Sequence, residues 1–257
     1  AHDMPADQIP PAVQLLVVEE DEPKPGVDFF DNIATEKLFD TPGAIARIYR
    51  STARERRIVV SAEKSFDVNG RPLTFHWALL QGQSDGVQIT PLNEQKSVVE
   101  IRVRWHERFP IAPGSKMESN RVDIGAFVHN GAYYSAPAFI SFYFPDCEKR
   151  IYNDQGKIAS VEYRSRAAGG NYVDPLIYAW RDWRDEYHYD AAGTLTGWTR
   201  IRKNAREEFA ANGELILERD AQGKPTKTRA VRYRAAQKAP TQAPVLEQVV
   251  VDDPAAG

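Results

Sequence analysis

The stretch FHWALLQGQSDGVQI, Phe75 to Ile89, decides the fold because it is compatible with two very different structures. Its centre, Gly82-Gln83-Ser84-Asp85-Gly86, has the G-x-S-x-G spacing of serine hydrolases, where the serine occupies a sharp turn between a strand and a helix. The residues that follow, Val87 to Pro91, are β-branched, alternate in polarity and end at a proline, so they predict a strand. Since the hydrolase mechanism needs the helix, we interpret residues 82–86 as a loop between two strands.

Strand patterns continue on both sides of this loop. Leu73 to Leu80 precedes it, and Val98 to Trp105 alternates apolar and charged side chains with a period of two. Asn69-Gly70 and Asn130-Gly131 are hairpin-type turn sequences. Further strands are expected at Ile58 to Val60, Val122 to Val128 and Ala138 to Phe144. Short strands separated by turns of this kind predict an antiparallel β-sandwich.

The residues KSFDVNGRPLTFHW, Lys64 to Trp77, resemble the opening of PKD-like (polycystic kidney disease type) immunoglobulin-like domains, which read S-x-D-x-(D/N)-G-x-P-L-(T/S)-(Y/F)-x-W. Tyr134-Ser135-Ala136-Pro137-Ala138, after Asn130-Gly131, is similar to the last hairpin of that family. The resemblance covers residues 57–144, without the W-x-F-G-D-G stretch of the best-known members. It implies a β-sandwich with Trp77 in its core, a secreted or periplasmic setting, and the role of an accessory module in a larger enzyme or surface protein.

A second pattern begins after Phe144, where an aromatic residue is followed by a glycine four positions later and an apolar residue two further on. It occurs at Tyr152 to Ile158, Tyr189 to Leu195 and Phe209 to Leu215, with a weaker copy at Asp220 to Gly223. Each copy predicts a β-hairpin whose turn is made by Asp or Asn with Gly, and such hairpins need paired neighbours to be stable. The first two copies weakly resemble YD-type (RHS-like) repeats.

The expected fold class is mostly β, with an immunoglobulin/PKD-like antiparallel sandwich, a C-terminal β-hairpin meander and one short N-terminal helix. Thr41-Pro42 provides an N-cap and a first-turn proline, and Ile45, Ile48 and Tyr49 follow at helical spacing, so the helix is placed at Gly43 to Ser51. Val13 to Val18 and Val245 to Val251 are β-prone segments near the ends and could add strands to a partner. The predicted parts are an N-terminal linker with the helix (1–51), the sandwich (52–145), the hairpin region (146–234) and a flexible tail (235–257).

Composition narrows the function classes. The 257 residues carry a net charge of −3, so no overall basic field favours nucleic acid. Cys147 is the single cysteine, which excludes an intramolecular disulfide and a cysteine-based zinc site. No apolar run is long enough for a transmembrane helix. The histidines form no metal-binding motif, and His76 and His106 are expected to be exposed on strands.

The sequence contains one candidate calcium site. Asp67 and Asn69, with a backbone carbonyl, could ligate calcium, which accepts oxygen ligands from flexible loops. An Asx turn accounts for the same two residues without a metal, and we favour that interpretation. No other cofactor is predicted.

The segment from Trp180 to Trp198 is rich in aromatic and acidic residues and is the candidate contact surface. Its members are Trp180, Trp183, Tyr187, Tyr189 and Trp198, interleaved with Asp182, Asp185 and Glu186. Exposed, such a surface would suit a protein partner or a polysaccharide. Buried, the same rings would form the core of the second β layer, which is the alternative that we favour.

The function predicted from these features is non-catalytic. The chain is expected to be an accessory or interaction module of a larger bacterial assembly or secreted protein, located in the periplasm or outside the cell, with a protein partner or the rest of a longer polypeptide. The alternative is a polysaccharide-binding or polysaccharide-degrading protein that uses the 180–198 segment.

Overall fold

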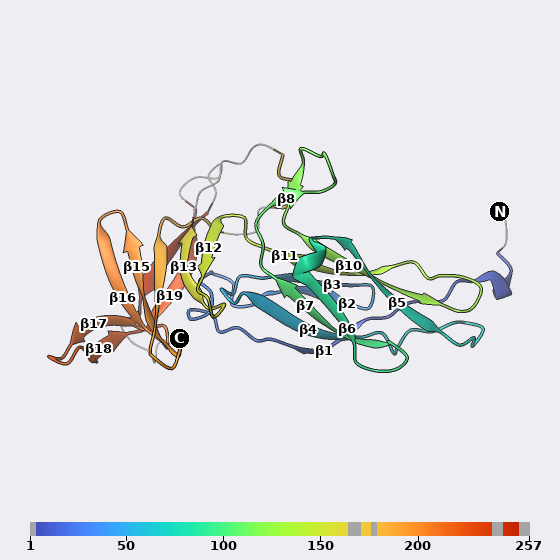
Figure 1. Ribbon diagram of the computed structural model, residues 1–257, viewed down its shortest axis with the longest axis horizontal. Coiled ribbons are helices and arrows are strands. Elements are labelled where there is room, and N and C mark those ends of the chain that lie inside the picture. Colours follow the sequence, from blue (N-terminus) through green and yellow to red (C-terminus); the bar gives the residue numbers. More distant parts are fainter. Residues whose placement is uncertain (1–3, 164–170, 176–178, 238–243, 252–257) are drawn as a thin grey trace.

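The computed structural model describes residues 4–163, 171–175, 179–237 and 244–251. These residues form strands almost throughout, in two units that lie side by side along the long axis of the molecule (Figure 1). Helical geometry in the described ranges is limited to two 3-10 turns, η1 Ala6–Gln8 and η2 Ser84–Gly86. The mostly-β fold class is therefore confirmed. None of the helices in these ranges has the length and apolar character needed to cross a membrane.

The first unit is a sandwich of two sheets. The four-stranded sheet has the order β1-β4-β7-β6, with bounds β1 Leu16–Glu20, β4 Glu55–Ser61, β7 Val98–Arg104 and β6 Val87–Pro91. The five-stranded sheet has the order β2-β3-β11-β10-β5, with bounds β2 Lys37–Thr41, β3 Ala44–Ile48, β11 Ala138–Tyr143, β10 Val122–His129 and β5 Thr74–Gln81. β3 pairs in parallel with β11, and the other pairs are antiparallel. Apart from β2 and β3, the orders β1-β4-β7-β6 and β11-β10-β5 correspond to the A-B-E-D and G-F-C orders of immunoglobulin domains. A small ribbon of β8 Phe109–Pro110 and β9 Glu118–Ser119 projects from it.

The sandwich core follows the period of two in the sequence. In β7, Val99, Ile101 and Val103 are fully buried, whereas Glu100 and Arg102 point outward and form an ion pair. Burying each such aliphatic side chain stabilises the fold by roughly 1.5–3 kcal/mol. Trp77 packs against this core but is only half-buried, and its indole Nε1 donates a 2.9 Å hydrogen bond to the Lys96 carbonyl. It lies at the rim because β5 is an edge strand.

The loop interpretation of residues 82–86 is confirmed. β5 ends at Gln81, the single turn η2 covers Ser84–Gly86, and β6 begins at Val87 in the opposite sheet. The G-x-S-x-G segment therefore carries the chain from one sheet to the other.

The helix predicted at Gly43 to Ser51 is wrong, because these residues form β3 and its continuation. Thr41 and Ala44 exchange two 3.0 Å hydrogen bonds through the Thr41 hydroxyl, which closes the β2–β3 turn. Ile45 and Tyr49 face the sandwich core, and parallel pairing with β11 overrides the helical spacing of the apolar residues. The predicted linker over 1–51 is also wrong, since β1, β2 and β3 all belong to the sandwich.

The second unit is a seven-stranded antiparallel meander. Its strands, in sheet order, are β12 Glu148–Tyr152, β13 Ile158–Tyr163, β14 Arg184–Tyr189, β15 Leu195–Arg202, β16 Ala205–Ala210, β17 Leu215–Arg219 and β18 Pro225–Arg229. All four predicted hairpin turns are present, with positive φ at Gly156, Gly193, Gly213 and Gly223. In three of them an Asx-type bond closes the turn, as between Lys157 N and Asn153 Oδ1 at 3.0 Å. The predicted C-terminal β-hairpin meander is confirmed.

Both β-prone ends pair within the chain. β1 is bonded to β4, and β20 Val245–Val250 is bonded to β19 Val231–Ala236. Leu246 in β20 is 2% exposed and packs into the core of the second unit, so the flexible tail predicted from residue 235 is wrong for residues 235–237 and 244–251. The rest of that tail, residues 238–243 and 252–257, lies outside the described residues.

Buried charged and aromatic side chains join the two units. Arg150 in β12 donates to the carbonyl oxygens of Ser51 (2.6 Å) and Arg50 (3.3 Å), which follow β3 of the sandwich. Phe30, from the segment between β1 and β2, is inserted into the core of the meander, 5.3 Å from the Trp198 ring. Phe30, Arg50 and Ser51, all near the first three strands of the sandwich in the sequence, therefore contact the second unit.

Candidate binding cleft at the edge of the sandwich

The predicted aromatic surface is wrong for four of its eight residues, which are buried in the core of the second unit. Trp183, Tyr187, Trp198 and Asp185 are 2%, 8%, 1% and 0% exposed. Their side chains lie on one face of the meander, and β19, β20 and Phe30 cover that face. The alternative that we favoured, an aromatic core of the second β layer, accounts for them.

The other four residues do not form a common binding face. Trp180 and Tyr189 are half-buried, and their polar atoms bond to the backbone carbonyls of Arg181 (2.7 Å) and Ile158 (2.9 Å). Asp182 is exposed and lies 3.6 Å from Arg202, while Glu186 pairs with Arg184 at 2.8 Å. Asp182 and Glu186 thus lie apart from the buried rings, and the described part of the segment presents no set of exposed rings on which a sugar could stack.

The Asp67–Asn69 loop is an Asx turn. One carboxylate oxygen of Asp67 accepts from the backbone N–H groups of Asn69 and Arg71, both at 3.0 Å, and the other accepts from the Asn130 amide at 2.8 Å. The Asn130 hydrogen bond is the main cause that lowers the pKa of Asp67. No group of three candidate metal-ligating side chains occurs in the described part of the chain, and the calcium prediction gains no support from this geometry.

His76 is exposed as expected, but the expectation for His106 is wrong. The His106 ring lies 5.1 Å from the Phe109 ring and 5.1 Å from the Phe144 ring. Desolvation in this aromatic setting lowers the pKa of His106.

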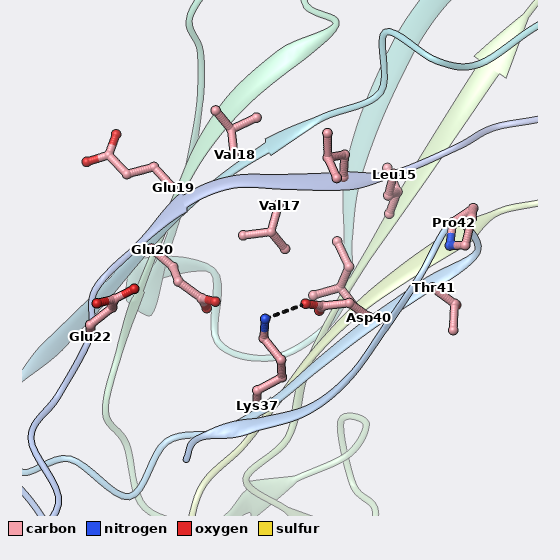
Figure 2. Close-up of a pocket in the computed structure, with 12 residues that line it drawn as sticks. Leu15, Val17, Val18, Glu19, Glu20, Glu22, Lys37, Asp40, Thr41 and Pro42 are labelled. Carbon is pink, nitrogen blue, oxygen red and sulfur yellow. Dashed lines mark ion pairs between the residues drawn. The ribbon is translucent and has the colours of Figure 1, made fainter. Parts of the chain in front are cut away.

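A cleft of about 490 Å³ opens where the edge strands of the two sheets approach each other, and we call it the edge cleft (Figure 2). β1 is the edge of one sheet and β2 is the edge of the other. Val17 points into the space between them, and the Lys37–Asp40 ion pair (3.0 Å) lies opposite it (Figure 2). The lining residues are Leu15, Leu16, Val17, Val18, Glu19, Glu20, Glu22, Lys37, Asp40, Thr41, Pro42 and Ile45.

A buried arginine holds the two edge strands together. Arg47, 1% exposed, extends from β3 and bonds to Glu20 of β1 at 2.6 and 3.0 Å and to Asp40 of β2 at 2.6 and 3.3 Å. Burial alone would raise the pKa of Asp40, but hydrogen bonds from Arg47 and Lys37 outweigh that effect and lower it. Arg47 therefore substitutes for the backbone bonds that the two strands do not make.

The backbone at the edge cleft is open to a further strand. In the described residues one backbone hydrogen bond crosses it, from Leu15 N to Pro42 O at 2.8 Å, at one end. Beyond that point, the outer edges of β1 and β2 have no backbone partner among these residues. Four carboxylates and one lysine line the cleft, and Glu22 is exposed and forms no ion pair with a described residue. The arrangement suits an extended chain with positive charge.

Replacing Arg47 with methionine is expected to destabilise the sandwich by about 2 kcal/mol, because Glu20 and Asp40 would face each other without their shared cation. Urea denaturation measures this change. The triple variant Arg47→Met/Glu20→Gln/Asp40→Asn should recover most of the loss, since the repulsion is then absent. A single variant as stable as the wild type would show that Arg47 does not hold the edges together.

Sequence reasoning missed this cleft. The sequence predicts a linker with a helix over residues 1–51, and Arg47 lies inside the predicted helix. Alternation around Ile45, Arg47 and Tyr49 is the one local signal that could have placed the arginine on the inward face of a strand.

Comparisons with known proteins add little to this picture. No protein-family model matches the chain, and no curated protein matches it. One solved structure is similar over part of the chain, a nucleoside hydrolase-related hypothetical protein from Saccharophagus degradans described as associated with carbohydrate metabolism. It shares 13% sequence identity over 44% of this chain, with a TM-score of 0.27, and the match spans 26% of that protein. A similarity this low supports no conclusion about the fold or the function of this chain.

Proposed function

We propose that this chain is a non-catalytic interaction module of a larger extracytoplasmic bacterial assembly or secreted protein, and that it holds an extended, basic segment of a partner polypeptide in the edge cleft. The observation that carries the proposal is the pair of edge strands, β1 and β2, that face each other with unpaired backbone across a cleft lined by core residues and carboxylates. An added strand would supply the missing backbone bonds, and its apolar side chains would contact Val17 and Ile45.

Charge supports a basic partner. Glu19 is paired with Arg57 at 2.8 Å, and the remaining carboxylates, Glu20, Glu22 and Asp40, exceed Lys37 and the Arg47 behind them by one negative charge. The extracytoplasmic setting rests on the resemblance of residues 57–144 to PKD-like domains. The burial of Trp183 and Trp198 gives the polysaccharide alternative no support.

A peptide-binding experiment tests the proposal. A fluorescent synthetic peptide of alternating lysine and valine is expected to bind the wild-type chain, with an affinity that falls as salt is added, while its glutamate–valine counterpart does not bind. Glu22→Lys should weaken binding by about five-fold, equivalent to ~1 kcal/mol. Glu94→Lys, an exposed position in the β6–β7 loop, is the matched control with the same change in net charge. Equal binding of the two peptides, or equal effects of the two variants, would contradict the proposal.

A further inference from the structure

The edge strand β5 is open to pairing with an identical strand in a way that the other sheet edges are not. It pairs with β10 on one side, and no backbone hydrogen bond joins Thr74–Gln81 to any other described segment. Its eight residues include no charged residue and no proline. The one irregularity in its register lies between Leu79 and Gln81, so residues 74–79 form a regular, extended edge.

The other edges of the sandwich and the meander carry features that disfavour pairing with a second copy of the same strand. Natural proteins protect exposed edges with short strands, charged side chains, prolines and bulges. These features are Glu19 and Glu20 in β1, Lys37 and Asp40 in β2, Pro91 in β6, Lys149 and Arg150 in β12, and Pro225 and Lys227 in β18. β1 and β2 are each five residues long and have a register shift as well. β5 has no comparable protection along residues 74–79.

An apolar patch lies on the outer face next to this edge, at the end formed by Ala78 and Leu80. Leu80 is 48% exposed, and a side chain at Gly125 on the neighbouring strand would meet Leu80 and Phe127 within 3 Å, so these two side chains close over the glycine. A strand added beside β5 would cover the exposed part of Leu80. The gain in backbone bonds would then be accompanied by apolar burial.

We propose that two copies of this chain associate by antiparallel pairing of their β5 strands about a two-fold axis. A two-fold contact presents the same strand from both copies, so any charge on the strand would meet a like charge nearby. β5 carries none, whereas β1, with Glu19 and Glu20, would repel itself. The two five-stranded sheets join into one continuous sheet in this dimer. β2, with the edge cleft, is the opposite edge of the same sheet, so each copy keeps its cleft free and the dimer does not depend on the proposed peptide binding.

Sedimentation equilibrium of the full chain tests the proposal. We expect a reversible monomer–dimer equilibrium, with the dissociation constant raised at least ten-fold by Ala78→Lys, an exposed position in the middle of β5. Leu217→Lys, at an exposed apolar position in β17, is the matched control and should leave the equilibrium unchanged. Circular dichroism checks that each variant is folded. A chain that remains monomeric at about 1 mM, or a dimer that Ala78→Lys leaves intact, overturns the proposal.

Cysteine cross-linking locates the contact. His76, Ala78 and Leu80 lie on the outer face of β5, and each is replaced singly by cysteine. The variant whose cysteine is nearest the two-fold axis should form a disulfide-linked dimer under mild oxidation. The native Cys147 is buried, and burial raises the pKa of its thiol, so it should remain unreacted. A cysteine at Val18 on β1 is the control and should stay monomeric. Cross-linking through Val18 in place of β5 would overturn the proposed geometry.

Discussion

Arg200→Met is expected to lower the free energy of unfolding by about 3–5 kcal/mol, because it leaves Asp185 charged and without its partner in a closed core. Both side chains are 0% exposed. Arg200 donates two 2.8 Å hydrogen bonds to the Asp185 carboxylate, and its remaining nitrogen reaches the Tyr233 hydroxyl (2.7 Å) and Gln248 (2.8 Å). Burial alone would lower the pKa of Arg200, but Asp185 more than compensates and raises it.

The aromatic rings around Arg200 explain why no nearby group can replace its charge when it is substituted. The guanidinium carbon lies 4.4 Å from the Phe30 ring centroid and 4.3 Å from that of Trp183. Phe30 comes from the N-terminal segment, and Gln248 comes from β20. A single cation therefore binds β14, β15 and both ends of the chain, and water cannot reach the carboxylate that it would leave behind.

Chemical denaturation of the single and double variants measures this effect. Arg200→Met/Asp185→Leu should recover stability to within about 1 kcal/mol of the wild type, because apolar pairs of similar volume replace buried ion pairs at little cost. The double-mutant cycle separates the pairwise coupling from the loss of packing. A loss below about 1 kcal/mol for Arg200→Met would contradict the expected role.

Gly197→Ala is expected to destabilise the meander by about 3 kcal/mol or more. Gly197 in β15 has φ +148°, a region that is essentially restricted to glycine, which costs other residues about 1–3 kcal/mol. An alanine Cβ there would lie 2.0 Å from the Phe209 carbonyl oxygen. That oxygen belongs to β16, which is bonded to β15 at the same position, so it cannot move away without breaking the pairing.

Two other glycines provide controls for Gly197. Gly223→Ala changes a residue with φ +80° and no atom within 4 Å of the added carbon, so it should cost only the backbone penalty of about 1–2 kcal/mol. Gly43→Ala has neither a positive φ nor a close contact and should be nearly neutral. Thermal unfolding followed by circular dichroism ranks the three variants. Equal losses at Gly197 and Gly223 would show that the contact with Phe209 relaxes freely.

The parts of the fold that were predictable depend on local chemistry. The turns at Asn153–Gly156 and Asp190–Gly193 are specified by their own residues, because the Asx bond and the positive φ need no distant partner. β7 was predictable for a similar reason, because its apolar and charged residues alternate as expected for a strand with one buried face and one solvated face.

The errors arise where a distant segment decides the structure. Gly43 to Ser51 has helical spacing, yet pairing with β11 makes it a strand. Asp185 looked like a surface acid because polarity alone cannot show that Arg200, fifteen residues away, neutralises it inside a core. The edge cleft depends on β1 and β2 meeting across two sheets, and no motif in either strand records that meeting.

The insertion of Phe30 into the second core has a consequence for how the chain is made. The meander is synthesised after the sandwich, but its interior needs a ring from residue 30 and a leucine from residue 246. A fragment cut at residue 146, where the sheets change, would expose the faces of Trp198 and Tyr233 that Phe30 covers. A fragment that begins at residue 146 is therefore expected to be less stable than the same residues in the full chain, because its core lacks the ring of Phe30.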